Sequence, residues 1–255
     1  MRPSLVLLSC LLLPSLAQAE SVTAETTLPL LEHVGVKLLC EQSSPLLLRG
    51  QPDVLQSKLA VLFDSQTMCQ ELAEQVATAL TVEQTQQAQE LLQGEITQQF
   101  SAAERAVGEQ PEKLGAYRER LREQAPRGER VGLIKRLDDA AHTTELASML
   151  RYELGKTQAL IALLRQGQNL DEAELTARTQ TQHDAIRQSS ADAVSTFMLF
   201  AYRQIPSEQL EAYVNVYEAP SIKQLLKSGV DTIPLLFADR RDQLRKDINQ
   251  ISAVQ

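Results

Sequence analysis

Apolar residues recur with the period of an α-helix along almost the whole chain, and no segment shows the alternation of a β-strand. The clearest pattern lies in residues 205–229, which begin with an apolar stripe formed by Leu210, Tyr213, Val214 and Tyr217. Pro220 predicts a break after Ala219, because proline disfavours helical geometry in the residue before it. Gly229 predicts the end of a second short helix, whose apolar positions are Ile222, Leu225 and Leu226. The pattern predicts a helix–proline–helix hairpin that other helices must cover.

The rest of the chain predicts an all-α, multi-helix bundle of similar amphipathic segments. Residues 28–40 predict a first helix, and Pro45 and Gly50 mark the following residues 41–50 as a loop. Further helices are predicted at residues 55–62, 69–80, 81–108, 114–121, 130–164 (as two helices), 171–203 and 230–251. The densest apolar face belongs to the helix at 171–203, at Ile186, Ala193, Val194, Phe197, Met198 and Ala201. We expect this helix to form the centre of the core and to be covered by the hairpin.

Polar and proline residues predict where several of these helices begin. Thr81 with Gln84, and Asp171 with Glu174, have the spacing of a capping box, in which two side chains satisfy free backbone N–H groups. Pro234 is expected in the first turn of the last helix, where proline is tolerated.

Residues 205–229 show a weak sequence similarity to a segment that lies 125 residues earlier in the chain. Residues 80–84 match residues 205–209, and Gly94–Glu95 falls at the Ala219–Pro220 break. Two alternatives remain open: a chance similarity between amphipathic helices, or two copies of one helical module related by a pseudo-twofold axis. The second alternative divides the chain at the central break around Pro126 into halves, 20–125 and 127–255.

The first nineteen residues have the pattern of a secretory signal. The basic residue Arg2 precedes the mostly apolar residues 5–13, and Ala17–Gln18–Ala19 has the small residues of a cleavage site. We expect cleavage after this motif, which leaves a periplasmic or secreted all-α domain at residues 20–255. The alternative is a lipoprotein anchored at Cys10. After the signal, no apolar run is long enough to cross a membrane.

Charge and cysteine content narrow the class of protein further. The chain has a formal net charge of −8, and removal of Arg2 with the signal changes the balance to 24 − 33 = −9. This acidity argues against nucleic-acid binding, which needs a clustered basic face.

In an exported chain, Cys40 and Cys69 predict one disulfide that joins the N-terminal helix to the body. Such a bond should stabilise the fold by about 3–4 kcal/mol. Two buried thiols are the alternative.

The sequence contains no recognisable catalytic motif. The histidines have no metal-ligand spacing; they are His33, His142 and His183. Gly155–Lys156–Thr157 resembles the end of a phosphate loop, but Leu150 stands where that loop needs glycine. The acidic residues are typical of helix ends and solvated faces, at Asp138, Asp139, Asp171, Glu172 and Glu174. We therefore predict no catalytic residue, cofactor or metal, although an enzyme site assembled from scattered residues stays open.

Two groups of side chains remain as candidates for binding. Four basic residues lie on the last predicted helix, at Arg240, Arg241, Arg245 and Lys246. They either form salt links to the acidic body or make a peripheral contact with an anionic membrane surface. Tyr202, Tyr213 and Tyr217 either line a groove between helices or pack in the core with their hydroxyls in contact with water.

Residues 197–230 combine a polar helix cap, an apolar stripe and a proline break. The residues that carry this motif are Glu208–Gln209–Leu210, Val216–Tyr217, Ala219–Pro220 and Lys223–Gln224–Leu225–Leu226. The motif resembles an uncharacterised domain family of exported bacterial proteins, whose members usually carry Phe-Tyr, Ser-Pro and Gly here. In this chain Val216 replaces the phenylalanine, Ala219 the serine, and Ile222 or Lys223 the glycine. The resemblance implies export and an all-α fold, and it supplies no catalytic residues.

These patterns together predict a non-enzymatic exported protein that acts by binding. The expected partner is another envelope protein, held in a groove between helices. The alternative is a small apolar ligand or lipid in a cavity between the two halves. A cavity of several hundred cubic ångströms lined by Leu, Phe and Tyr would favour the ligand, whereas a solid core with an exposed apolar groove would favour the protein partner.

Overall fold

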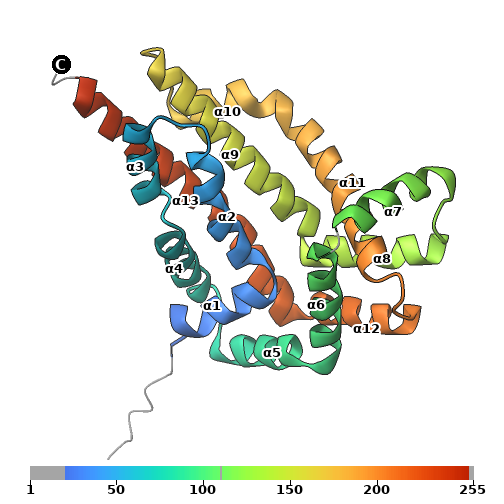
Figure 1. Ribbon diagram of the computed structural model, residues 1–255. Helices are drawn as coiled ribbons and strands as arrows, with labels where there is room; N and C mark the ends of the chain where they lie inside the picture. Colours follow the sequence, from blue (N-terminus) through green and yellow to red (C-terminus); the bar gives the residue numbers. More distant parts are fainter. Residues whose placement is uncertain (1–20, 110, 253–255) are drawn as a thin grey trace, which may run out of the picture.

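The computed structural model describes residues 21–109 and 111–252, which form α-helices, one 3₁₀ turn and no β-strand (Figure 1). The helices are α1 (Ala24–His33), α2 (Val36–Leu48), α3 (Asp53–Leu62), α4 (Ser65–Ala77), α5 (Val82–Gln93), α6 (Glu95–Gly108), α7 (Pro111–Glu123), α8 (Gly128–Ala141), α9 (Thr143–Arg165), α10 (Glu172–Thr179), α11 (His183–Ala201), α12 (Ser207–Glu218) and α13 (Pro220–Ser252). The all-α prediction is confirmed. The predicted signal, with its cleavage motif and Cys10, lies outside the described residues. Within those residues, no helix has both the length and the apolar character needed to cross a membrane.

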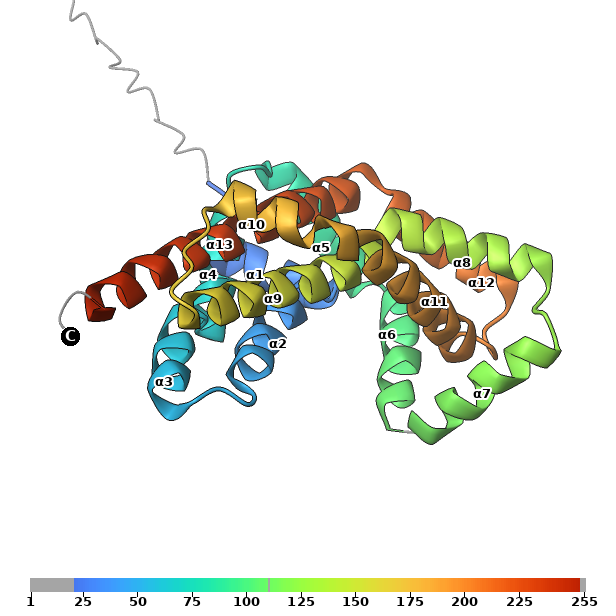
Figure 2. The same cartoon turned by 90° about the horizontal axis from the view of Figure 1, so that it is seen from above.

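The helices form two groups (Figures 1 and 2). In the first group α13, which has 33 residues, contacts α4, α5 and α9, while α1, α2 and α4 pack on one another. In the second group α11 contacts α6, α7 and α8, and α12 contacts α6 and α8. The groups do not follow the chain. Helices α9 and α13 from the second half of the sequence pack among α1–α5, and α6 and α7 from the first half pack on α11.

The helix boundaries show the same 125-residue spacing as the proposed internal repeat. Helices α5 and α12 both have 12 residues, and their bounds, 82–93 and 207–218, differ by 125. Gly94 and Ala219 follow them with the same φ of −62° and with extended ψ angles of 154° and 139°. In both copies the next helix, α6 or α13, begins at the following residue. The continuous helix predicted at residues 81–108 is therefore divided, because Gly94 adopts extended backbone geometry.

The two helix pairs also pack on each other reciprocally. Helix α6 of the first pair contacts α12 of the second, and α13 of the second pair contacts α5 of the first. Gln99 Nε2 donates to Gln209 Oε1 at 3.0 Å, and Gln224 Nε2 donates to the Ala79 carbonyl at 3.3 Å. Gln99 and Gln224 are 125 residues apart, so they occupy equivalent places in α6 and α13. The acceptors Gln209 and Ala79 are not equivalent under this offset, so the repeat, with a pseudo-twofold axis, stays a hypothesis.

The N-terminal helices differ from the prediction in two places. The helix predicted at residues 28–40 is divided at Gly35, whose φ of 76° lies in the left-handed region that glycine adopts readily. Helix α2 then continues through the predicted loop, with Pro45 inside it. Proline has no N–H, so the Glu41 carbonyl loses its helical partner. That carbonyl instead accepts a hydrogen bond from Ser65 Oγ at 3.3 Å, a contact from α4 that the local pattern did not reveal.

The predicted disulfide between Cys40 and Cys69 is confirmed. The two Cα atoms lie 5.6 Å apart, which is within the usual range for a disulfide. Cys40 lies inside α2 rather than at the end of a first helix, and Cys69 lies in the second turn of α4. The bond therefore joins two helices of the first group, one of which lines the groove described below.

Helix α13 is longer than predicted, because neither Gly229 nor Pro234 interrupts it. Gly229 faces Val36 of α2, and a Cβ atom there would lie 3.5 Å from Val36 Cγ1. The helix buries apolar side chains on both sides of this glycine, at Leu225, Leu226, Val230 and Ile233. Their burial outweighs the helix-propensity cost of glycine, about 1 kcal/mol. The hairpin prediction is corrected accordingly, since α13 leads away from α12 instead of returning along it (Figures 1 and 2).

Helix α11 is not the centre of the core. The helix predicted at residues 171–203 is interrupted by a 3₁₀ turn at Gln180–Gln182, where all three residues are exposed and no packing holds the helix continuous. In α11 itself Ala193 is exposed, and Ile186 and Phe197 are only half-buried. Helix α12 packs mainly on α8 and α6 instead of covering the apolar face of α11. The central place belongs to α13.

Candidate functional site

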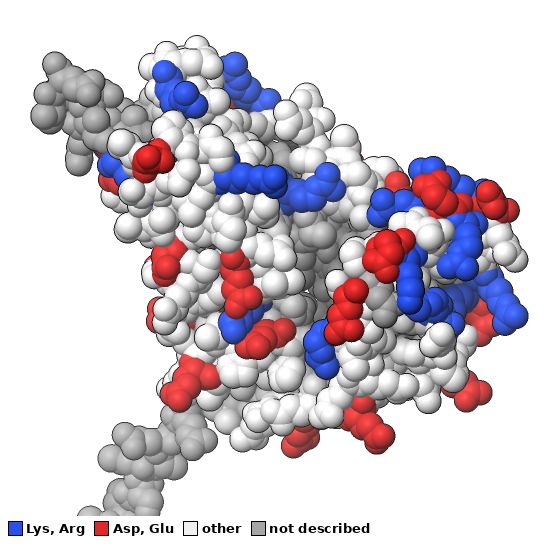
Figure 3. Space-filling model, in the orientation of Figure 1, with Lys and Arg blue, Asp and Glu red and all other residues white. Residues whose placement is uncertain are grey.

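A groove of about 790 Å³ opens between the two helix groups. One wall is formed by the end of α1 and the start of α2, and the opposite wall by α6. The floor comes from the junction of α8 and α9, from α11 and from α12. Figure 3 shows the surface hollowed between the two groups, with acidic and basic side chains on both sides of the hollow.

Two left-handed turns position the walls and floor of this groove. Gly35 makes the turn between α1 and α2, and His142, with a φ of 53°, makes the turn between α8 and α9. His142 provides no side-chain cap for α9. The Asp138 carboxylate takes this role and accepts from the Thr144 backbone N–H at 2.7 Å. The short connections bring helix ends from both groups to one place.

The three tyrosines that the sequence singled out all line this groove. They are also buried, with 1%, 2% and 6% of Tyr202, Tyr213 and Tyr217 exposed. Tyr202 ends α11, and Arg130 holds this end by donating to the backbone carbonyls of Tyr202 and Ile205. Tyr213 and Tyr217 lie one turn apart on α12 with their hydroxyl oxygens 3.3 Å apart. Burial raises the pKa of all three phenols, that of Tyr217 to about 12, so they are neutral at pH 7.

Glu104 of α6 places a half-buried carboxyl group among these tyrosines. The Tyr202 hydroxyl donates to Glu104 Oε1 at 2.5 Å. Phe100, one turn earlier on α6, stacks on Tyr213 with ring centroids 4.0 Å apart and an interplanar angle of 18°. Burial raises the pKa of the Glu104 carboxyl, and the Tyr202 hydrogen bond and the Arg105 charge offset part of this rise. The tyrosines of the floor therefore meet one carboxyl on the α6 wall.

The rest of the groove is apolar inside and charged at its edge. Its main apolar side chains are Leu38, Leu39, Leu137, Leu146, Phe197 and Met198. At the edge Lys37 Nζ lies 2.8 Å from Glu32 Oε2 and 3.6 Å from Glu41 Oε1, and His33 and Arg105 also line the groove. An apolar interior with a few placed polar groups is the usual composition of a ligand pocket.

Sequence reasoning missed Glu104, although a signal was present. The apolar stripe of α6 runs through Ile96 and Phe100 at a spacing of four residues, and Val107 continues it. Glu104 takes the next place after Phe100, where the periodicity calls for an apolar residue. A carboxyl in line with an apolar stripe indicates a buried polar group that needs a partner.

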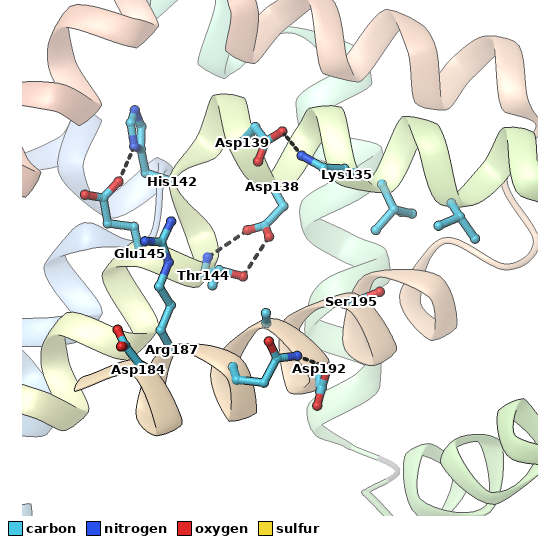
Figure 4. A pocket seen from close by; sticks show the side chains of 14 residues that line it. Lys135, Asp138, Asp139, His142, Thr144, Glu145, Asp184, Arg187, Asp192 and Ser195 are labelled. Atoms are coloured by element: carbon cyan, nitrogen blue, oxygen red, sulfur yellow. Dashed lines mark hydrogen bonds and ion pairs between the residues drawn. The ribbon is translucent and has the colours of Figure 1, made fainter. Parts of the chain in front are cut away.

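A second pocket of about 740 Å³ lies between α8, α9 and α11 (Figure 4). Its side chains are largely charged, and many of them satisfy one another. Lys135 Nζ lies 2.6 Å from Asp139 Oδ2, and His142 Nδ1 lies 2.7 Å from Glu145 Oε2. Asp138 is engaged by Thr144, as described above. We therefore interpret this pocket as a solvated polar surface and the groove as the candidate site.

A buried ion-pair network accounts for two of the predicted basic residues. The fully buried Arg241 lies 2.7 Å from Glu153 Oε2 and 2.6 Å from Glu172 Oε1. Lys156 lies 2.8 Å and Arg245 3.2 Å from the Glu172 carboxylate. Burial alone would raise the pKa of Glu172, but hydrogen bonds from Arg241 and Lys156 outweigh it and lower that pKa to about 2. We call these five residues the ion-pair network.

The remaining predicted residues have structural places. Arg240 lies 2.5 Å from Glu71, so three of the four basic residues predicted as a patch form ion pairs with the body, and the fourth, Lys246, is exposed. This favours salt links over a membrane contact. Lys156 lies inside α9, in the network, rather than in a phosphate loop.

The histidines are separate from one another. His33 is at the edge of the groove, His142 pairs with Glu145, and the ring of His183 lies 5.3 Å from that of Tyr152. Over residues 21–109 and 111–252, no His, Cys, Asp and Glu side chains gather in a group that could hold a metal ion.

Comparison of the chain with family models, with curated proteins and with solved structures finds no match. The family resemblance of residues 197–230 therefore stays a hypothesis, and the function has to be argued from the groove itself.

Proposed function

We propose that this chain is a non-enzymatic binding protein of the cell envelope and that it holds a small, largely apolar ligand in the groove. The observation that carries this proposal is the groove's volume of about 790 Å³, with Leu, Phe and Tyr side chains in its lining. Ligand pockets typically occupy about 300–1,000 Å³ and are mostly apolar. The groove lies between the two helix groups, and helices from both halves of the sequence form its walls and floor.

Neutral phenols and a carboxyl suit ligand recognition better than chemistry. The tyrosine hydroxyls stay protonated at pH 7 because burial raises their pKa values. They can therefore donate hydrogen bonds to a ligand or to Glu104, and they are poor proton acceptors. The groove thus has the groups needed to orient a ligand.

The test is a binding assay with the groove blocked. The neutral apolar dye N-phenyl-1-naphthylamine should bind the purified protein saturably, with an increase in its fluorescence. Ala147→Trp fills part of the groove, because Ala147 lines it, and should weaken binding by about tenfold or more. Ala191→Trp is the matched control, since Ala191 is also half-buried but lines the second pocket. No saturable binding, or equal loss in both variants, would contradict the proposal.

A protein partner is the second candidate function, and one observation favours it. Leu38 lies at the groove with 51% of its surface exposed, which gives the groove an apolar lip. A photo-crosslinking residue at position 38, introduced in living cells, should then capture one envelope protein in stoichiometric yield. Under the ligand proposal this residue captures no protein reproducibly, while the dye still binds.

Export is part of the proposal and has its own test. We propose cleavage after Ala19 and formation of the Cys40–Cys69 bond outside the cytoplasm, where disulfides persist. Mass spectrometry of the protein from its producing cells should give an N-terminus at Glu20. A lipid on Cys10 would support the lipoprotein alternative, and a chain that retains its first residues would contradict export.

A further inference from the structure

The chemistry of the groove floor indicates what kind of ligand it holds. Glu104, on the α6 wall, is the acidic residue next to the floor, half-buried among Tyr202, Tyr213 and Tyr217. Among the described residues it forms no ion pair, and its hydrogen-bond donor is a neutral phenol. A carboxylate without a cationic partner in a half-buried place is costly to desolvate, and a bound cation would offset that cost.

Three tyrosines line the groove with this carboxyl, and the rings of Tyr202 and Tyr213 pack on Phe100. The Phe100 ring lies 4.0 Å from the Tyr213 ring and 4.8 Å from the Tyr202 ring, centroid to centroid. The Tyr217 ring lies 5.1 Å from that of Tyr213. The carboxylate therefore carries the preference for an ammonium group, and the tyrosine hydroxyl oxygens beside it can accept further hydrogen bonds from that group.

We propose that the ligand of this groove is an organic amine, whose ammonium group pairs with Glu104 beside the tyrosine hydroxyls and whose apolar part lies on the leucine and phenylalanine side chains. This inference rests on the proposed ligand-binding function and specifies the charge of the ligand. An anionic ligand is disfavoured because it would bring a second negative charge to Glu104. At the edge, Lys37 is already paired with Glu32 and Glu41.

The inference is tested with three probes of one chain length: n-octylamine, n-octanol and octanoate. Titration calorimetry at pH 7 should show the amine binding about tenfold more tightly than the alcohol, as expected for one charge-assisted contact. In Glu104→Gln, which keeps the shape and the hydrogen-bond acceptor for Tyr202, the amine and the alcohol should bind equally. Glu145→Gln is the matched control, since it removes the same charge from α9 in the second pocket and should keep the preference.

Three other outcomes of the probe titrations would each contradict this inference. Equal affinity of the unaltered protein for amine and alcohol would overturn this inference and leave the proposed function standing. Tighter binding of octanoate would overturn it in favour of an anionic ligand. Binding of none of the three probes would contradict both the inference and the function on which it rests. Because these comparisons use the unaltered protein, they hold even if Glu104→Gln folds poorly.

Discussion

Two centres of the molecule place carboxyl groups away from water, and they are built in opposite ways. In the ion-pair network, Glu153 and Glu172 share the guanidinium of the fully buried Arg241, and Lys156 and Arg245 add two further cations. At the groove, Glu104 has a tyrosine hydroxyl as its hydrogen-bond donor. The first centre lowers the pKa of Glu172, and the second raises the pKa of Glu104.

We interpret the difference as one between a structural role for the network and the proposed binding role of the groove. The network joins α9, the start of α10 and α13. Its carboxylates are neutralised by the arginine and lysine side chains of the same network, inside the fold. The Glu104 centre opens onto a groove, and among the described residues Glu104 forms no ion pair, although the neighbouring Arg105 charge offsets part of the rise in its pKa. A buried charge that the fold does not neutralise indicates a place where something else binds.

The largest effect is expected from the network. Arg241→Met leaves Glu153 and Glu172 without their main partner and should lower the free energy of unfolding by about 3–5 kcal/mol. Arg240→Met is the control, because its partner Glu71 is more exposed, and it should cost less than about 1 kcal/mol. Urea unfolding followed by circular dichroism measures both. Equal losses in the two variants would remove the distinction between buried and exposed pairs.

The second prediction concerns the pH dependence of stability. Glu172 has a folded-state pKa of about 2, below its ordinary value of 4.5, so its contribution is present above pH 4.5 and lost as the pH falls towards 2. The contribution should be about 2–3 kcal/mol. Urea midpoints at pH 6, 4 and 2.5 should fall less steeply in Glu172→Gln than in the unaltered protein. Glu90→Gln, on an exposed face, should leave the profile unchanged.

Tyr202→Phe should have a smaller effect at the other centre. It removes the hydroxyl that donates to Glu104 Oε1, and it should cost about 1–2 kcal/mol, because the bond is made to a half-buried carboxyl. Tyr152→Phe is the comparison: it removes a bond of 3.0 Å to the neutral Thr179 hydroxyl and should cost less. Thermal unfolding of both variants checks the order, and a larger loss in Tyr152→Phe would reverse it.

The smallest change in stability is expected for Glu104→Gln. The folded-state pKa of Glu104 is raised, so its ionisation opposes folding, and its contribution to stability is lost as the pH rises above its ordinary value of 4.5. The variant should therefore be as stable as the unaltered protein at pH 7, or slightly more stable, by less than about 1 kcal/mol. Its pH trend should be the opposite of that of Glu172→Gln. A loss above about 2 kcal/mol would assign Glu104 a structural role.

Local signals in the sequence predicted much of the fold. The Thr81 hydroxyl caps α5 by accepting from the Gln84 N–H at 3.1 Å, and the Asp171 box caps α10 in the same way. The disulfide was predicted from the number of cysteines and from the expected export of the chain. Two predictions failed where a distant contact outweighed a local one: Pro45 stays helical with the help of Ser65, and Gly229 is packed against Val36 inside α13. Pro234 was expected in the first turn of the last helix and lies in the interior of α13 instead.

The candidate site was predictable only in part. Helical spacing placed Tyr213 and Tyr217 on one face of a helix, and the structure puts that face at the groove. The two walls come from α6 and from the turn at Gly35, and no local pattern shows that these segments line the same groove as α12. Glu104 was not predicted as a site residue, because one charged residue in a mostly apolar stripe does not by itself show which side chains surround it in the fold.

The offset of 125 residues between the two helix pairs, α5–α6 and α12–α13, bears on the number of ligands that one chain can bind. It equates Glu104 with Gly229, Tyr213 with Ala88, and Tyr217 with Leu92. At the second place Val36 lies against Gly229, whereas Glu104 lies at the groove. If the two helix pairs are copies of one module, only one copy carries the carboxyl, and calorimetry should count one bound amine per chain.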